Sequence, residues 1–165
     1  MADGLRQEGL SGWPLVERAQ QVVHQRFSDY SCLYWWESAV TAFIRRRGYC
    51  VQYNTALQLL LEELGIDSRP VHAYRVRLVN DPSWRMGHMW LRVTLDGDTR
   101  DVCAGSRSID AVSLRFTPVT RVRRFGPAMR SLTTVGTAGA VMAAQLRTTI
   151  SRKPRPRWLH HPLDT

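Results

Sequence analysis

Cys50, His88 and Asp101 are residues of the types that form a thiol catalytic triad, and they occur in that order along the chain. In such a triad a cysteine sulfur attacks a carbonyl carbon, an imidazole takes and returns the proton, and a carboxylate holds the imidazole in the required tautomer. The chemistry of this set is acyl transfer or hydrolysis through a thioester. We therefore take Cys50, His88 and Asp101 as the candidate catalytic residues.

The sequence around Cys50 predicts that this residue begins a helix. Residues 51–64 carry apolar side chains at helical spacing, and Gly65 is a typical C-terminal stop. Unpaired backbone N–H groups and the positive end of the helix dipole favour a thiolate, so we expect the pKa of Cys50 to be lowered. The same N–H groups could stabilise an oxyanion. The alternative interpretation is that Cys50 is a small buried apolar residue.

His88 lies in a predicted strand, because apolar and polar side chains alternate over residues 86–95. Asp96 and Gly97 form a hairpin-turn signal, and residues 99–103 predict the returning strand. The pattern therefore places the candidate base and the candidate acid on neighbouring antiparallel strands.

The register of this hairpin tests the triad. A two-residue turn places Asp101 opposite Arg92, on the same face as His88 but four residues, or about 14 Å, further along the strand. A bulge, strong coiling of the strands or a different loop would be needed to close that gap. Asp96 and Asp98 are the alternative candidates for the acid.

Three short blocks of the sequence resemble a known family. Residues 47–54 (RGYCVQYN), 87–93 (GHMWLRV) and 101–105 (DVCAG) resemble the catalytic blocks of arylamine N-acetyltransferases. Together with residues 64–71 they are also similar to the wider transglutaminase-like superfamily of cysteine enzymes, which shares a papain-like core. The resemblance implies an α+β fold with N-terminal helices followed by an antiparallel sheet. It also implies that the three residues named above form the triad.

The sequence departs from the acetyltransferase pattern in three ways, of which the last bears on the acyl donor. That family has two glycines before the tyrosine and the cysteine, whereas this chain has Gly48 alone, and it has Gly-Phe-Gly where this chain has Cys103-Ala104-Gly105. The acetyltransferases also carry a further domain for coenzyme A, and only residues 102–165 follow Asp101 here. We therefore expect no required cofactor, and an acyl-coenzyme A or a carrier-bound thioester is the alternative co-substrate.

The predicted function is a thiol-dependent acyltransferase that passes an acyl group from Cys50 to an amine. A cysteine peptidase or amidase of the same superfamily is one alternative, and a non-catalytic basic binding module on the same fold is another. The expected partners are an acyl donor and an amine acceptor, or a peptide substrate. The candidate substrate-binding residues are aromatic side chains that could wall the acyl pocket or pack in the core: Trp36, Tyr49, Trp84 and Trp90.

Length and composition predict one domain. The chain has 165 residues, of which 44% are apolar, and this is enough for a single core without metal or disulfide support. We place the catalytic domain at residues 1–150 and a basic, proline-rich flexible tail at residues 151–165. The other expected elements are helices at about residues 15–27, 33–46 and 131–150, strands at 69–79 and within 113–122, and a frayed segment at 1–14.

Cysteine usage favours a reducing compartment. The chain has three cysteines, an odd number, with no paired spacing typical of a metal site and no apolar N-terminal segment before them. We therefore expect a cytoplasmic protein without a metal, in which Cys32 and Cys103 are packed thiols. Residues 131–150 are too short and too weakly hydrophobic for a membrane span.

The charge of the chain is strongly positive. The formal net charge is +9, but 22 of the 23 basic residues are arginine, a bias that a GC-rich genome produces without selection for phosphate binding. We therefore do not expect a nucleic-acid partner. The basic tail could attract an acidic protein.

Overall fold

The computed structural model describes residues 1–78, 87–105, 109, 116–152 and 154–162. Five helices lie in these ranges: α1 (Ala2–Gln7), α2 (Gly12–Arg26), α3 (Ala39–Ile44), α4 (Cys50–Glu63) and α6 (Pro127–Ser151). The strands are β1 (Asp29–Ser31), β2 (Arg47–Gly48), β3 (Ser68–Ala73), β4 (Val76–Leu78), β5 (His88–Leu95), β6 (Asp98–Val102), β7 (Phe116–Pro118), β8 (Arg123–Arg124) and β9 (His160–Pro162).

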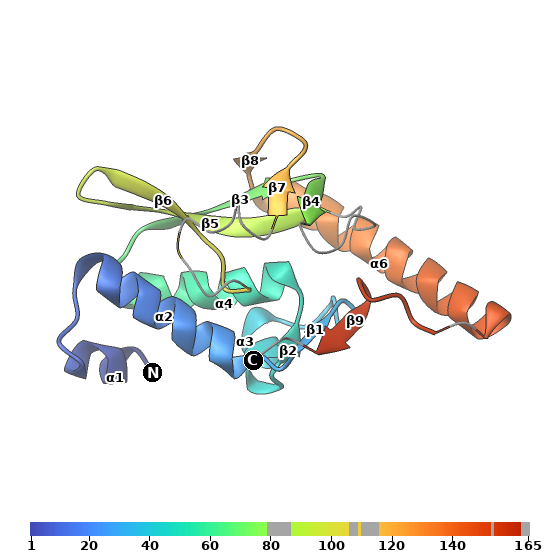
Figure 1. Ribbon diagram of the computed structural model, residues 1–165, viewed down its shortest axis with the longest axis horizontal. Helices are drawn as coiled ribbons and strands as arrows, with labels where there is room; N and C mark the ends of the chain where they lie inside the picture. The colour runs from blue at the N-terminus through green and yellow to red at the C-terminus, as the bar shows by residue number, and fades with distance from the viewer. Residues whose placement is uncertain (79–86, 106–108, 110–115, 153, 163–165) are drawn as a thin grey trace.

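The central sheet has the strand order β6-β5-β3-β8, and every pair in it is antiparallel. A small sheet of order β2-β1-β9 and the antiparallel pair β4-β7 complete the described strands. Helices α2 and α4 lie on one side of the central sheet, and α6 extends away from the body (Figure 1). The predicted α+β fold, with N-terminal helices before an antiparallel sheet, is confirmed.

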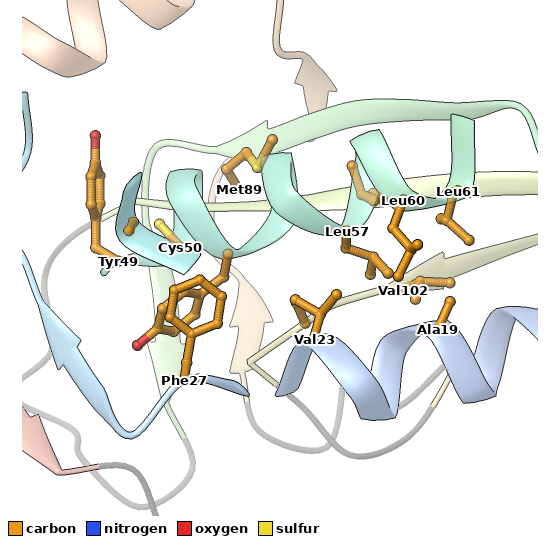
Figure 2. Close-up of a cluster of buried hydrophobic side chains, with 14 of the residues drawn as sticks. Ala19, Val23, Phe27, Tyr49, Cys50, Leu57, Leu60, Leu61, Met89 and Val102 are labelled. Carbon is orange, nitrogen blue, oxygen red and sulfur yellow. The ribbon is translucent and has the colours of Figure 1, made fainter. Parts of the chain in front are cut away.

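Helix α4 is central to the core because it packs between α2 and the sheet. Its residues Leu57 and Leu61 are fully buried against Val23 of α2 and Leu91 of β5. Figure 2 shows the side chains of α2 and α4 facing one another in this layer. Leu57, Leu60 and Leu61 recur at the three- and four-residue spacing of one helix face, which is why this segment is a helix and why it has a fixed orientation.

The β5-β6 hairpin has the predicted two-residue turn. Asp96 and Gly97 both have positive φ angles, 51° and 82°, as the primed turn types that match strand twist require. Asp101 pairs with Arg92, so the predicted register is confirmed.

Several element predictions were wrong. Residues 1–14 are not frayed, because α1 buries Ala2 and Leu5 and α2 begins at Gly12. The helix expected at 33–46 is limited to α3, whose first turn is capped by the Ser38 side chain accepting from the Thr41 N–H. The strand expected at 69–79 is divided into β3 and β4.

The tail predicted to be flexible is partly ordered. Its strand β9 pairs with β1, and Leu159 just before it is fully buried. The Cys32 N–H also donates to the Leu159 carbonyl. Residues 159–162 therefore return to the body and pack against it.

Candidate active site

A cavity of about 350 Å³ lies where the start of α4, the start of β5 and the helix α6 come together. Cys50 and His88 both line it, and so do Leu132, Thr133 and Thr137 of α6. The helix start and the strand start thus bring the two candidate residues, far apart in the sequence, to one partly open cavity. Most of the other lining side chains are apolar or aromatic: Tyr30, Cys32, Tyr49, Val51, Ala73, Tyr74, Met89 and Phe125.

Cys50 is the first residue of α4, as predicted, and it is 7% exposed. Burial raises the pKa of its thiol to about 11. Hydrogen bonding from the backbone of Met89 and of Val51 and from the side chain of Tyr30 acts in the opposite direction and favours the thiolate. The expected lowering of the pKa is therefore wrong for this structure, because the loss of water around the sulfur outweighs the helix terminus and its neighbours.

His88 is the first residue of β5 and pairs with Ala73 of β3. Burial lowers the pKa of its imidazole to about 3, so the ring is neutral at physiological pH and can accept a proton. The ring stacks on Trp90 with a centroid separation of 6.0 Å. The preceding Gly87 allows the chain to approach the end of β3 closely, because a Cβ at this position would lie 2.8 Å from the Ala73 carbonyl oxygen.

Among the described residues, the Sγ of Cys103 lies 3.3 Å from the imidazole Nε2 of His88. Cys103 is 1% exposed, lies one residue beyond β6 and is not among the residues that line the cavity. The sequence analysis predicted that Cys103 is a packed thiol, and its burial confirms this.

Asp101 is not brought to His88. Its carboxylate accepts two hydrogen bonds from Arg92, at 2.9 and 3.2 Å, and the residue lies opposite Arg92 rather than opposite the start of β5. The hairpin keeps the simple register, so four residues of strand separate this carboxylate from the imidazole. Asp98 is bound to Arg100, and Asp96 lies in the turn. Of the three residues predicted as the triad, Cys50 and His88 therefore line one cavity, whereas Asp101 is bound to Arg92.

Asn54 is a residue of the site that the sequence reasoning missed. It lies one turn after Cys50 on α4 and is fully buried. Its amide nitrogen donates to the carbonyls of Cys50 and Met89, at 3.0 and 2.8 Å, and its oxygen accepts from the Ala104 N–H at 2.9 Å. The sequence feature that could have identified Asn54 is its position, four residues after Cys50 in a predicted helix, because a buried amide there must find hydrogen-bond partners.

The comparisons with known proteins agree with this geometry. The family model described as the transglutaminase-like superfamily matches residues 9–99, which is more than half of the chain. The chain belongs to the transglutaminase-like superfamily. The matched range includes Cys50 and His88 and ends before Asp101 and Cys103. Among curated proteins, none matches this chain significantly.

A solved structure shares the fold of this transglutaminase-like chain. It is a protein from Cytophaga hutchinsonii that is provisionally described as a cysteine protease, and the alignment has a TM-score of 0.51 and 14% identity. The alignment covers 76% of this chain, which spans about half (49%) of the length of the other. At this identity the likeness establishes the fold alone.

The predicted substrate-binding residues of the transglutaminase-like chain have different positions. Tyr49, immediately before α4, is buried and lines the cavity. Trp90 is fully buried behind His88 and packs with Val71, Ala73, Val76 and Cys103 rather than lining the cavity. Trp36 is 62% exposed and contacts Trp35 and Tyr34, away from the cavity. Trp84 lies outside the described residues.

In the part of the chain that the structure describes, no group of three or more His, Cys, Asp or Glu side chains is placed to hold a metal ion. Each helix there also falls short of the length or the hydropathy that a membrane span requires.

Proposed function

We propose that this transglutaminase-like chain is a thiol-dependent acyltransferase in which Cys50 is the nucleophile and His88 the general acid and base. The observation that carries the proposal is that a cysteine at a helix start and a neutral imidazole line one largely apolar cavity. Cys103 contacts the imidazole but does not line the cavity, whereas Cys50 and Cys32 both do. Of these two, Cys50 is the more exposed, at 7% against 1%, and it alone stands at a helix start, so we take Cys50 as the nucleophile.

The first step forms an acyl-enzyme. As the Cys50 sulfur attacks the carbonyl carbon of the donor, His88 takes the thiol proton, and the bond to the leaving group breaks as His88 returns that proton to it. The backbone N–H of Cys50, at the start of α4, would donate to the developing oxyanion. Because the thiol and the imidazole are both uncharged at rest, proton transfer accompanies the attack rather than preceding it.

The second step passes the acyl group to an amine. The amine nitrogen attacks the thioester carbon, His88 takes one proton from it, the C–S bond breaks, and the proton returns to the Cys50 sulfur. The apolar lining of the cavity supports transfer rather than hydrolysis, since a site poor in water protects a thioester from it. No cofactor is required in this scheme, and a carrier-bound or coenzyme A thioester would serve as a donor.

A cysteine peptidase or amidase is the second candidate. It uses the same first step on a peptide or amide carbonyl, with water as the acceptor in the second. The observation that favours it is the fold shared with the protein provisionally described as a cysteine protease.

The test uses p-nitrophenyl acetate as a generic acyl donor. We expect a burst of about one equivalent of p-nitrophenolate and an acetyl group on Cys50, located by peptide mass mapping. Cys50→Ser removes the burst and His88→Gln slows it. Hydroxylamine or glycinamide then diverts the acetyl group to an amide in an acyltransferase. If added amine changes neither the turnover nor the product, the hydrolase is the better account. If no acetyl group appears on Cys50, the nucleophile assignment fails.

A further inference from the structure

Helix α6 presents an apolar stripe to the solvent. Five large side chains along it are exposed by 58–75%: Leu132, Val135, Met142, Leu146 and Ile150. At 100° per residue these positions fall within about 80° of one another, and Gly139 lies in the same stripe. The buried residues Thr137 and Val141 are on the opposite face. Water-exposed apolar side chains in a continuous row are typical of a binding surface.

The stripe begins at the catalytic cavity. Its first residue, Leu132, also lines the cavity that holds Cys50 and His88. Helix α6 extends away from the body (Figure 1), and its 25 residues, Pro127–Ser151, have a total length of about 37 Å. A chain segment that lies along the stripe therefore has one end at the cavity.

The charge around α6 has one sign. Residues 116–162 contain nine of the 23 basic residues and none of the 14 acidic ones, so the rest of the chain is balanced. Exposed arginines lie on α6 and directly after it, at positions 130, 147, 152, 155 and 157. None of these five forms an ion pair with another described residue. By the same 100° spacing Arg147 lies about 60° from the edge of the stripe and Arg130 lies on the opposite face, so the positive charge near the stripe comes from Arg147 and from the arginines after α6. This charge complements an acidic partner.

We propose that the exposed face of α6 docks an acidic, amphipathic peptide segment of the substrate and leads it to Cys50. This inference rests on the proposed acyl-transfer function and assigns its substrate class, a protein or peptide with acidic residues beside an apolar row. The apolar row packs on the stripe, Gly139 allows a close approach, and the arginines pair with the acidic side chains.

An anionic membrane surface is a poorer match to the same helix. Helices that lie in a membrane interface carry a wide apolar face and a polar face rich in lysine and arginine. The stripe of α6 is narrow, and the only charged residues within Pro127–Ser151 are Arg130 and Arg147. These properties favour a helix-sized partner over a flat lipid surface.

The test measures binding of a fluorescein-labelled helical peptide, with leucines at three- and four-residue spacing and glutamates elsewhere, by fluorescence anisotropy. We expect the peptide to bind, and we expect its affinity to fall as the sodium chloride concentration is raised. A scrambled peptide of the same composition should not bind. The double variant Leu146→Ser/Ile150→Ser should weaken binding by at least about tenfold. The matched control is Leu59→Ser, an exposed leucine on α4 outside the cavity.

The outcomes separate docking from catalysis. Equal binding of the scrambled peptide, or no loss in the double variant with its helix content preserved by circular dichroism, overturns the proposal. Binding to phosphatidylserine-containing vesicles without binding to the peptide overturns it in favour of a membrane. A p-nitrophenyl acetate burst without peptide binding means that docking fails while the proposed function stands. Peptide binding without a burst means that the proposed function fails while docking stands.

Discussion

At the residue scale, the two residues proposed as nucleophile and base, Cys50 and His88, are uncharged at rest. Burial acts on the two side chains in opposite directions, raising the pKa of Cys50 to about 11 and lowering that of His88 to about 3. Each shift disfavours the charged form, so the structure does not hold a thiolate–imidazolium pair in the empty cavity. Activation of the sulfur therefore depends on the arrival of a carbonyl group.

The resting state predicts a steep pH dependence of alkylation. Iodoacetamide reacts with the thiolate, so its rate with Cys50 should rise about tenfold per pH unit from neutrality and level off only near pH 11. At pH 8 the rate should be more than about tenfold below that of a free thiol with a pKa of about 8.5. Intact mass and peptide mapping over pH 6 to 11 measure this. A plateau at or below pH 8 would mean that the pair is charged.

The contact between His88 and Cys103 predicts unequal effects of two substitutions. Cys103→Ala removes the sulfur from the imidazole Nε2, so we expect the acylation rate to fall by about tenfold or more and its pH profile to change, with partial recovery in Cys103→Ser. Asp101→Asn removes only the ion pair with Arg92, which is worth about 1 kcal/mol or less, and should change the rate by less than about threefold. The reverse ranking in p-nitrophenyl acetate kinetics would restore Asp101 as the acid.

The sequence predicts part of this site for a physical reason. Cys50 and His88 each stand at the start of an element with a clear period, and the element places the side chain. The contact between the imidazole and Cys103 depends instead on the path of the chain after β6, which brings Cys103 next to the start of β5. Counting along the hairpin excluded a close Asp101, but it did not predict the contact between Cys103 and the imidazole.

At the element scale, the buried amide of Asn54 ties the start of α4 to the sheet, in addition to the apolar packing of the helix. Asn54 bonds three backbone groups, those of Cys50, Met89 and Ala104, and therefore fixes the start of α4 relative to β5 and to the chain after β6. The two reactive side chains are carried by those same elements.

Replacement of this amide should affect stability and catalysis together. Asn54→Ala leaves buried backbone groups without partners, at about 1–3 kcal/mol each, so we expect the free energy of unfolding to fall by about 2–4 kcal/mol. The acylation rate should also fall, because the positions of Cys50 and His88 are no longer fixed. Urea unfolding and burst kinetics measure both. Asn54→Asp keeps the acceptor for Ala104 but turns a second carboxylate oxygen toward the Cys50 and Met89 carbonyls, so at neutral pH it should lose at least as much stability as Asn54→Ala. A clearly smaller loss in Asn54→Asp would contradict this account.

Long periodic elements were predictable and short ones were not. α4 and the β5-β6 hairpin follow from patterns that span many residues, and their positions agree with prediction. The helix expected at 33–46 failed because the aromatic residues at 34–36 have an apolar content but no cap before Ser38, and tertiary contacts hold them in a turn.

At the scale of the whole molecule, buried neutral histidines predict sensitivity to acid. Burial lowers the pKa of His88 to about 3 and also lowers that of His72, so below about pH 6.5 the unfolded chain binds protons that the folded chain does not. Stability is therefore complete above that pH and falls as the pH decreases toward 3, by at most about 1.4 kcal/mol per pH unit for each such proton.

Urea unfolding midpoints between pH 7 and 4 test this expectation. The loss of stability on acidification should be smaller in His88→Gln and smaller again in His72→Gln/His88→Gln, measured relative to each variant at pH 7. An unchanged loss in the double variant would mean that other groups account for the acid sensitivity.

The arrangement of the whole chain was only partly accessible from the sequence. Charge and composition indicated a basic tail, but the return of β9 to β1 depends on a pairing with a strand more than a hundred residues earlier, which local patterns do not encode. The place of α6 beside the cavity is also a long-range contact. Both features depend on contacts between segments distant in the sequence rather than on the secondary structure of each segment.

The one-sided charge around α6 gives the molecule a large electric dipole, with a positive end at this helix and a nearly neutral remainder. In the field of an acidic macromolecule the protein would rotate before contact and arrive with α6 in front. The torque would act over roughly 8–10 Å at physiological ionic strength and over about three times that distance in dilute buffer. Encounters that would otherwise be random in orientation would then be productive more often at low salt.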